Sequence, residues 1–175
     1  LGRCVYYKGF EYLIDSAKYL TDEYMILIGG NGPLKENLQN KIIENGLESR
    51  VKLLGRIEDD ELGSYYEACD IFCLPSIAKS EAFGIVQIEA MSFSKPIVAT
   101  KIDGSGVDWV NKNYVSGINV NPKDSKELAI SFNGLMSNDN IYKKYSEGAK
   151  NRFDEMFIRD AMADSVYHTY KEILK

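Results

Sequence analysis

The chain has 175 residues, of which 45% are hydrophobic and 27% charged, and its formal net charge is −5. A chain of this length and composition can bury one sizeable core, so we expect a single domain over residues 1–175. The negative charge and the scatter of the basic residues argue against a nucleic-acid surface, and three irregularly spaced cysteines argue against a disulfide framework or a metal site and favour a reducing cytoplasm.

Helix-like and strand-like segments alternate along the chain. Strands are predicted at residues 25–28, 51–54, 71–74, 97–100 and 117–120. Helices are predicted at residues 10–20, 33–45, 59–69, 84–93, 108–111, 125–136, 140–152 and 158–174. This order is typical of an α/β, Rossmann-like fold, in which helices cover both faces of a parallel sheet.

The last predicted helix carries an apolar stripe. Ile158, Met162, Val166 and Tyr170 recur at helical spacing, so this face must lie against something apolar. No stretch approaches the ~18 consecutive apolar residues that a membrane span needs, and the N-terminus lacks a signal-peptide pattern. The chain begins without a methionine and within an already patterned segment, which leads us to expect a fragment of a longer protein.

Two glutamates, Glu81 and Glu89, flank the predicted start of a helix at Gly84, shortly after a strand. The first N–H groups of a helix have no partner within it and favour an anion such as a phosphate. Glu89 lies one turn beyond Ile85 on the same face and could bond the hydroxyls of a ribose. Glu81 could bond a hexose. Equally, both glutamates could be solvated charges beside a helix start, which carboxylates stabilise anyway.

A glycine-rich turn, residues 29–33, follows the first predicted strand. It departs from the dinucleotide fingerprint, because the third glycine of that motif would fall on Lys35. The simplest interpretation is a tight turn that leads into a helix, and a supporting contact from Gly30 to a phosphate is the alternative.

Arg3 and Lys8 flank the opening segment of the chain. If a strand before Arg3 belongs to the sheet, both cations emerge at its carboxyl edge, near Glu81, where they could neutralise a diphosphate. Two exposed surface cations are the simpler alternative.

Four blocks of residues, in this order and at this spacing, resemble the C-terminal half of the family 4 retaining glycosyltransferases, which have the two-domain GT-B fold. The blocks are Gly2-Arg3 with Tyr7 to Phe10; Ile28 to Leu34; Val51 to Gly55 with Asp70-Ile71 and Pro75-Ser76; and Glu81 to Gly84 with Glu89 to Met91. The resemblance runs over nearly the whole chain. It implies a domain that binds the sugar donor, an N-terminal acceptor domain that is missing here, and a last helix that crosses back to that domain.

The resemblance also implies roles for individual residues. Arg3 and Lys8 would hold the donor diphosphate and Glu81 would lie near the transferred sugar, which makes these three the expected catalytic residues. The expected donor-binding residues are Gly30, Arg56, Ile57, Phe83, Gly84, Ile85, Val86 and Glu89. Among them, the backbone around Arg56 and Ile57 would read the base, main-chain groups of Phe83, Gly84 and Ile85 would meet the sugar or the distal phosphate, Val86 would pack near the ribose, and Glu89 would bond the ribose hydroxyls.

For the full-length protein, the resemblance implies transfer of a hexose from a UDP- or GDP-sugar to a glycan or lipid-linked acceptor, with retention of configuration and without a metal or another cofactor. The fragment alone would be inactive. The expected setting is polysaccharide or lipopolysaccharide assembly in the cytoplasm, with peripheral association at the inner face of the membrane. Two alternatives remain open: a UDP-sugar 2-epimerase-like GT-B protein, and a non-catalytic module that binds a nucleotide.

Overall fold

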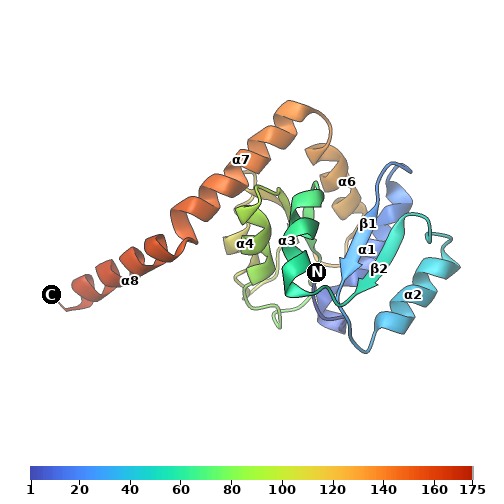
Figure 1. The fold of residues 1–175 in the computed structure, drawn as a ribbon, viewed down its shortest axis with the longest axis horizontal. Coiled ribbons are helices and arrows are strands. Elements are labelled where there is room, and N and C mark those ends of the chain that lie inside the picture. The colour runs from blue at the N-terminus through green and yellow to red at the C-terminus, as the bar shows by residue number, and fades with distance from the viewer. Residues whose placement is uncertain (175) are drawn as a thin grey trace.

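A computed structural model describes residues 1–174 (Figure 1). Its strands are β1 (Ile26–Gly29), β2 (Val51–Gly55), β3 (Phe72–Leu74), β4 (Ile97–Thr100) and β5 (Gly117–Val120). Its helices are η1 (Tyr6–Lys8), α1 (Phe10–Ser16), η2 (Ala17–Tyr19), α2 (Lys35–Glu44), α3 (Asp59–Ala68), α4 (Ile85–Ser92), α5 (Val107–Val110), α6 (Ser125–Leu135), α7 (Asp139–Met156) and α8 (Arg159–Ile173), where η marks a 3₁₀ turn. The predicted alternation of strands and helices is confirmed.

Hydrogen bonding divides the strands into two parallel sheets, β1–β2 and β3–β4–β5. Among residues 1–174, no strand pairs with the second edge of β1 or with that of β3. A cavity of about 590 Å³ is lined by residues of both strands, together with Leu1 and residues of α3 and α6. The single sheet that the sequence predicts is therefore interrupted between β1 and β3.

Strand β4 lies at the centre of the three-stranded sheet and is buried along its whole length. Ile97 and Ala99 pack in one core cluster with residues of β3, α4, α5 and α7, whereas Val98 packs in a second cluster with residues of α1, α2, α6 and β1. Because successive side chains of a strand point to opposite faces, β4 separates the core into these two clusters. Helix α4 packs against α7, and α1 packs against α2 and α6.

The turn before α2 differs from its prediction for a local reason. The helix begins at Lys35 rather than near Pro33. The N–H of Leu34 donates to the Cys4 carbonyl at 3.0 Å, and the N–H of Cys4 donates to the Asn31 carbonyl at 2.8 Å. These bonds tie the turn to the opening segment of the chain, and Leu34 becomes the N-cap of the helix.

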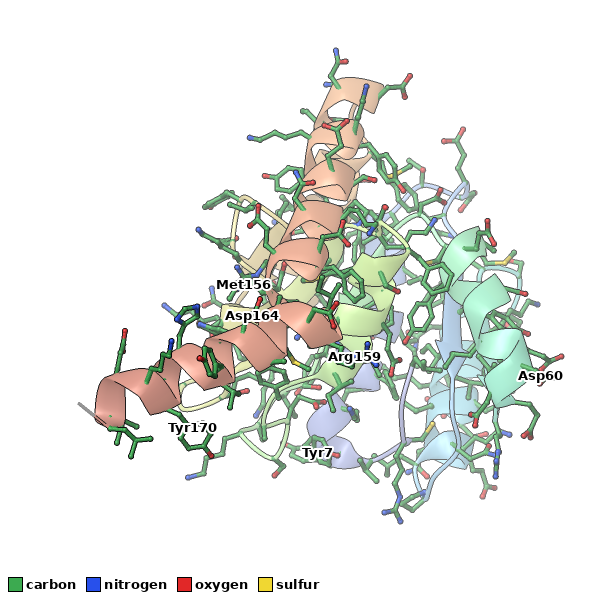
Figure 2. All side chains as sticks on the ribbon, turned by 60° about the vertical axis from the view of Figure 1, so that its left-hand side comes forward. Tyr7, Asp60, Met156, Arg159, Asp164 and Tyr170 are labelled. Carbon is green, nitrogen blue, oxygen red and sulfur yellow. The ribbon has the colours of Figure 1, made fainter. Side chains whose placement is uncertain are left out.

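Helix α8 follows α7 and projects away from the rest of the chain (Figure 1). None of its residues is buried, and its apolar stripe is 37% exposed at Ile158 and 72% exposed at Ile173. Tyr170 on the same helix extends clear of the other elements (Figure 2). The apolar partner that the stripe predicts is therefore not found within residues 1–174. Across this part of the chain, no helix combines the length and the hydropathy of a membrane span.

Candidate functional site

The opening segment, residues 1–9, links the carboxyl ends of β1 and β3. The N–H of Gly2 donates to the Gly29 carbonyl at the end of β1 at 2.9 Å, and the N–H of Ile77, after β3, donates to the Tyr7 carbonyl at 2.8 Å. A Cβ atom added to Gly30, whose φ is +135°, would lie 1.8 Å from the Gly2 carbonyl oxygen. The close approach of the two segments therefore requires a glycine at position 30.

Lys8 and Glu81 form a buried ion pair at this edge. The Lys8 Nζ lies 2.5 Å from the Glu81 Oε2, and the two side chains are 11% and 10% exposed. The Ser76 hydroxyl donates to the same carboxylate oxygen at 2.8 Å, and Thr100 Oγ1 donates to the Ser76 carbonyl. A buried charge requires such partners. The structure thus brings two of the three expected catalytic residues together and adds Ser76, which the sequence singled out only as part of a matching block.

The loop that carries Glu81 is held by the turn between β4 and α5. The Ser105 hydroxyl donates to the Glu81 carbonyl at 2.5 Å, and the N–H of Gly106 donates to the Ala82 carbonyl at 2.7 Å. In the structure, the turn fixes the backbone on which Glu81 stands.

Helix α4 begins after Gly84, whose φ of 75° and ψ of 58° are left-handed. A Cβ atom at this position would lie 2.6 Å from Leu74 Cδ2, so the turn requires glycine for its conformation and for space. Within residues 1–174, the N–H groups of Ile85 and Val86 donate to no backbone carbonyl. The helix therefore presents unpaired donors beside the Glu81 loop, as the sequence predicts.

Glu89 lies one helical turn further along α4 and bonds to a residue that the sequence did not single out. The Tyr66 hydroxyl on α3 donates to Glu89 Oε2 at 2.6 Å. Burial and the neighbouring Glu89 carboxylate raise the pKa of the Tyr66 phenol above its ordinary value, so the phenol remains a donor. Nothing in the sequence marks Tyr66 among the twelve tyrosines, because its partner lies on another helix.

The cation Arg3 and the residues after β2 lie at the surface. Arg3 is exposed and forms no ion pair within residues 1–174. The Arg56 side chain is 73% exposed, and its Nε lies 3.3 Å from Glu58 Oε1. Ile57 lies close to the end of β1, since its Cδ1 would be 2.5 Å from a Cβ atom at Gly29. The side chain of Arg56 is thus turned toward a neighbouring acid. Its backbone therefore remains the expected contact to the base of the nucleotide.

The expected apolar contacts at the start of α4 are largely accessible. Phe83 is 38% exposed, and its ring centroid lies 5.9 Å from that of Trp109. Ile85 is 64% exposed, whereas Val86 is half-buried. Accessible apolar groups next to unpaired helix donors leave room for a ligand at this end of α4.

Residues 1–152 of the chain match the model of the family described as Glycosyl transferases group 1. The whole chain is 33% identical over 175 residues to O-antigen chain mannosyltransferase C of Escherichia coli and covers 46% of that protein. Ninety per cent of the chain is 27% identical to D-rhamnosyltransferase WbpZ of Pseudomonas aeruginosa and covers 40% of it. The chain spans about half the length of these and other curated relatives that it matches.

Solved structures support the same assignment. Anabaena Alr3699/HepE in complex with UDP has a TM-score of 0.84 and 26% sequence identity, over 98% of this chain and 48% of that one. The complex of the same protein with UDP-glucose has the same TM-score and identity over the same share of each chain. The fold prediction is confirmed, since the chain forms parallel sheets flanked by helices and its structural neighbours are GT-B glycosyltransferase domains. With a family model that matches most of its length, this chain belongs to the group 1 glycosyltransferases.

Proposed function

We propose that residues 1–175 form the donor-binding domain of a family 4 retaining glycosyltransferase. The full-length enzyme transfers a hexose from a UDP- or GDP-sugar to a glycan or lipid-linked acceptor. The observation that carries this proposal is the Lys8–Glu81 pair, which stands beside the unpaired N–H groups at the start of α4. The complexes of Anabaena Alr3699/HepE with UDP and UDP-glucose support a nucleotide sugar as the ligand. The similarity to the O-antigen mannosyltransferase of Escherichia coli supports a hexose as the transferred group and a role in polysaccharide assembly.

The donor diphosphate takes its charge compensation from three sources. An ammonium group has three donors, so Lys8 can bond phosphate oxygens while it remains paired with Glu81. Arg3 offers a forked guanidinium contact from its exposed position. The N–H groups at the start of α4 supply the third contribution through the helix dipole. In this arrangement Glu81 lies near the transferred sugar.

The nucleoside lies along α4 and the end of β2. Glu89 bonds the ribose hydroxyls through its carboxylate, and Val86 packs near the ribose. The backbone around Arg56 and Ile57 reads the base, because the Arg56 side chain is paired with an acid at the surface. Backbone recognition leaves both UDP-sugars and GDP-sugars as candidate donors. The Gly30 turn contacts a phosphate of the donor. The main-chain groups of Phe83, Gly84 and Ile85 contact the sugar or the distal phosphate.

Catalysis in this proposal consists of positioning and charge stabilisation. The diphosphate leaves with its negative charge held by Arg3, Lys8 and the helix, and it assists the incoming hydroxyl on the same face of the sugar, which retains the configuration. Loss of one such charge contact lowers the rate by on the order of 10²- to 10³-fold.

An N-terminal acceptor domain completes the enzyme in this proposal. The length of the curated relatives, about twice that of this chain, supports a second domain. The exposed apolar stripe of α8 supports a partner at that helix, because an unpaired apolar face stabilises the molecule only when it is covered. The isolated chain accordingly binds a nucleotide and transfers nothing, and the complete enzyme works at the cytoplasmic face of the membrane.

Calorimetry with UDP and with GDP tests the phosphate role. The Arg3→Ala variant is expected to bind the preferred nucleotide at least tenfold more weakly, because a hydrogen bond to a charged group contributes about 1.5–3 kcal/mol. Arg159→Ala removes an exposed cation from α8 and is expected to bind as the wild type does. Equal affinity of the wild type and Arg3→Ala for both nucleotides would refute the role of Arg3, and a wild type that binds neither would refute the proposed function.

A further inference from the structure

Tyr66 combines a fixed aromatic ring with a hydroxyl directed at a functional carboxylate. The residue is 4% exposed. Its ring stacks on Phe93 with the centroids 5.6 Å apart and an interplanar angle of 21°, and it lies 5.7 Å from the ring of Phe72. Because the ring is held on two sides, the direction of its hydroxyl is fixed by packing rather than by the hydrogen bond alone.

Glu89, the partner of this hydroxyl, has a more flexible side chain than Tyr66. Glu89 is only partly buried, and its side chain has three rotatable bonds, so without a partner it would sample several rotamers. The Tyr66 hydroxyl donates to its Oε2 at 2.6 Å. Within residues 1–174, Glu89 Oε1 accepts no hydrogen bond. One carboxylate oxygen is thus fixed and the other is available.

We infer that Tyr66 is the positioning residue for Glu89: it holds one carboxylate oxygen so that the other meets the ribose hydroxyls of the donor, and it thereby sets the preference for nucleotides that carry these hydroxyls. This inference rests on the proposed function, which gives Glu89 its ligand.

The Tyr66→Phe variant separates this role from packing. It removes the hydroxyl and retains the ring that stacks on Phe93. We expect UDP and GDP to bind it about three- to tenfold more weakly, a smaller loss than for a direct ligand contact, because the bond to Glu89 acts on the ribose only through the position of that carboxylate. The 2′,3′-dideoxy analogues lack the hydroxyls that Glu89 bonds, so their affinity is expected to change by less than about twofold. Calorimetry with each nucleotide and its dideoxy analogue measures this difference.

Tyr65→Phe is the matched control. Tyr65 is the preceding residue of α3, is 37% exposed and makes no hydrogen bond to Glu89. Its variant is expected to bind all four nucleotides as the wild type does. A melting curve for each variant shows that the chain remains folded.

The outcomes distinguish this inference from the proposed function by means of Glu89→Gln. Suppose that Glu89→Gln weakens the binding of the ribose nucleotides alone. If Tyr66→Phe then weakens the binding of the ribose and dideoxy nucleotides equally, or of neither, Tyr66 has no positioning role, and the proposed donor site is unaffected. If Glu89→Gln discriminates between the two forms as the wild type does, the ribose role of Glu89 is wrong, and the inference on Tyr66 is overturned with it.

Discussion

Lys8 and Glu81 lie 73 positions apart in the chain, and the Lys8 Nζ lies 2.5 Å from the Glu81 Oε2 in a site that excludes most solvent. The pair joins the opening segment to the loop after β3. Removal of either partner leaves the other charge buried and unpaired, and this cost exceeds the net contribution of the intact pair.

We therefore expect Glu81→Leu and Lys8→Met each to lower the free energy of unfolding by about 3 kcal/mol. The double variant is expected to be more stable than the sum of the two changes predicts, because it leaves no orphaned charge. Urea denaturation of the four proteins measures the coupling. Strict additivity would show that the two side chains do not interact in solution.

Gly84→Ala is expected to destabilise the chain and to impair nucleotide binding. The new Cβ atom would lie 2.6 Å from Leu74 Cδ2 and 2.8 Å from Gln87 Nε2, and the backbone φ is +75°. Gly104→Ala is the control, since Gly104 has the same φ and no atom lies within 4 Å of its added Cβ. Both variants carry the left-handed penalty of about 1–2 kcal/mol, and only Gly84→Ala adds the steric cost. Equal losses of stability in denaturant titrations would contradict the packing around Gly84.

Asn111 is a buried polar residue that ties the end of α5 to the central sheet. Its side-chain amide Nδ2 donates to Asn119 Oδ1 at 2.8 Å, and its side-chain oxygen Oδ1 accepts from the Ser116 hydroxyl at 2.9 Å. Asn111→Ala leaves Asn119 Oδ1 without its donor and the Ser116 hydroxyl with only its 3.3 Å bond to the Lys112 carbonyl, and we expect it to lower the free energy of unfolding by about 2–3 kcal/mol. Asn133→Ala, at an exposed position of α6, is expected to change stability by less than about 0.5 kcal/mol. Chemical denaturation compares the two variants, and similar losses would show that the Asn111 network contributes little.

Truncation after Ile158 removes α8 and is expected to leave the rest of the chain folded. The helix contains no buried residue, so its loss should change the free energy of unfolding by less than about 0.5 kcal/mol. Nucleotide affinity should also be unchanged. A longer truncation that removes the second half of α7 also removes Ala149, which is fully buried, and is expected to unfold the chain. Circular dichroism and calorimetry distinguish these cases, and a large loss of stability in the shorter truncation would show that α8 packs against the domain in solution.

The helices and strands could be predicted from the sequence because the patterns that indicate them are local. Strands such as Ile97–Thr100 are continuous apolar runs, and glycine or proline marks the turns between elements. The glycines at positions 30 and 84 were also informative, because each stands where a side chain would collide with a neighbouring segment.

The contacts between distant segments were not accessible in this way. The bond between Tyr66 and Glu89 depends on how α3 packs beside α4, and the pairing of Lys8 with Glu81 depends on how the opening segment crosses the sheets. The sequence assigned Lys8, Glu81 and Glu89 separate roles and assigned none to Tyr66. The separation of β1 from β3 was not predicted either, and Leu1, the first residue of the sequence, lines the cavity between them.

The gap between β1 and β3 also bears on the stiffness of the molecule. No ladder of backbone hydrogen bonds joins the two sheets within residues 1–174, so side-chain packing and the opening segment are what hold them together. In the isolated chain, deformation should concentrate at this seam, and the amides of β1 and β3 that face the cavity should exchange with solvent sooner than those of β4. Gly30 lies on one side of the seam and Glu81 on the other. A nucleotide that contacts both residues would therefore stabilise the two sheets relative to each other.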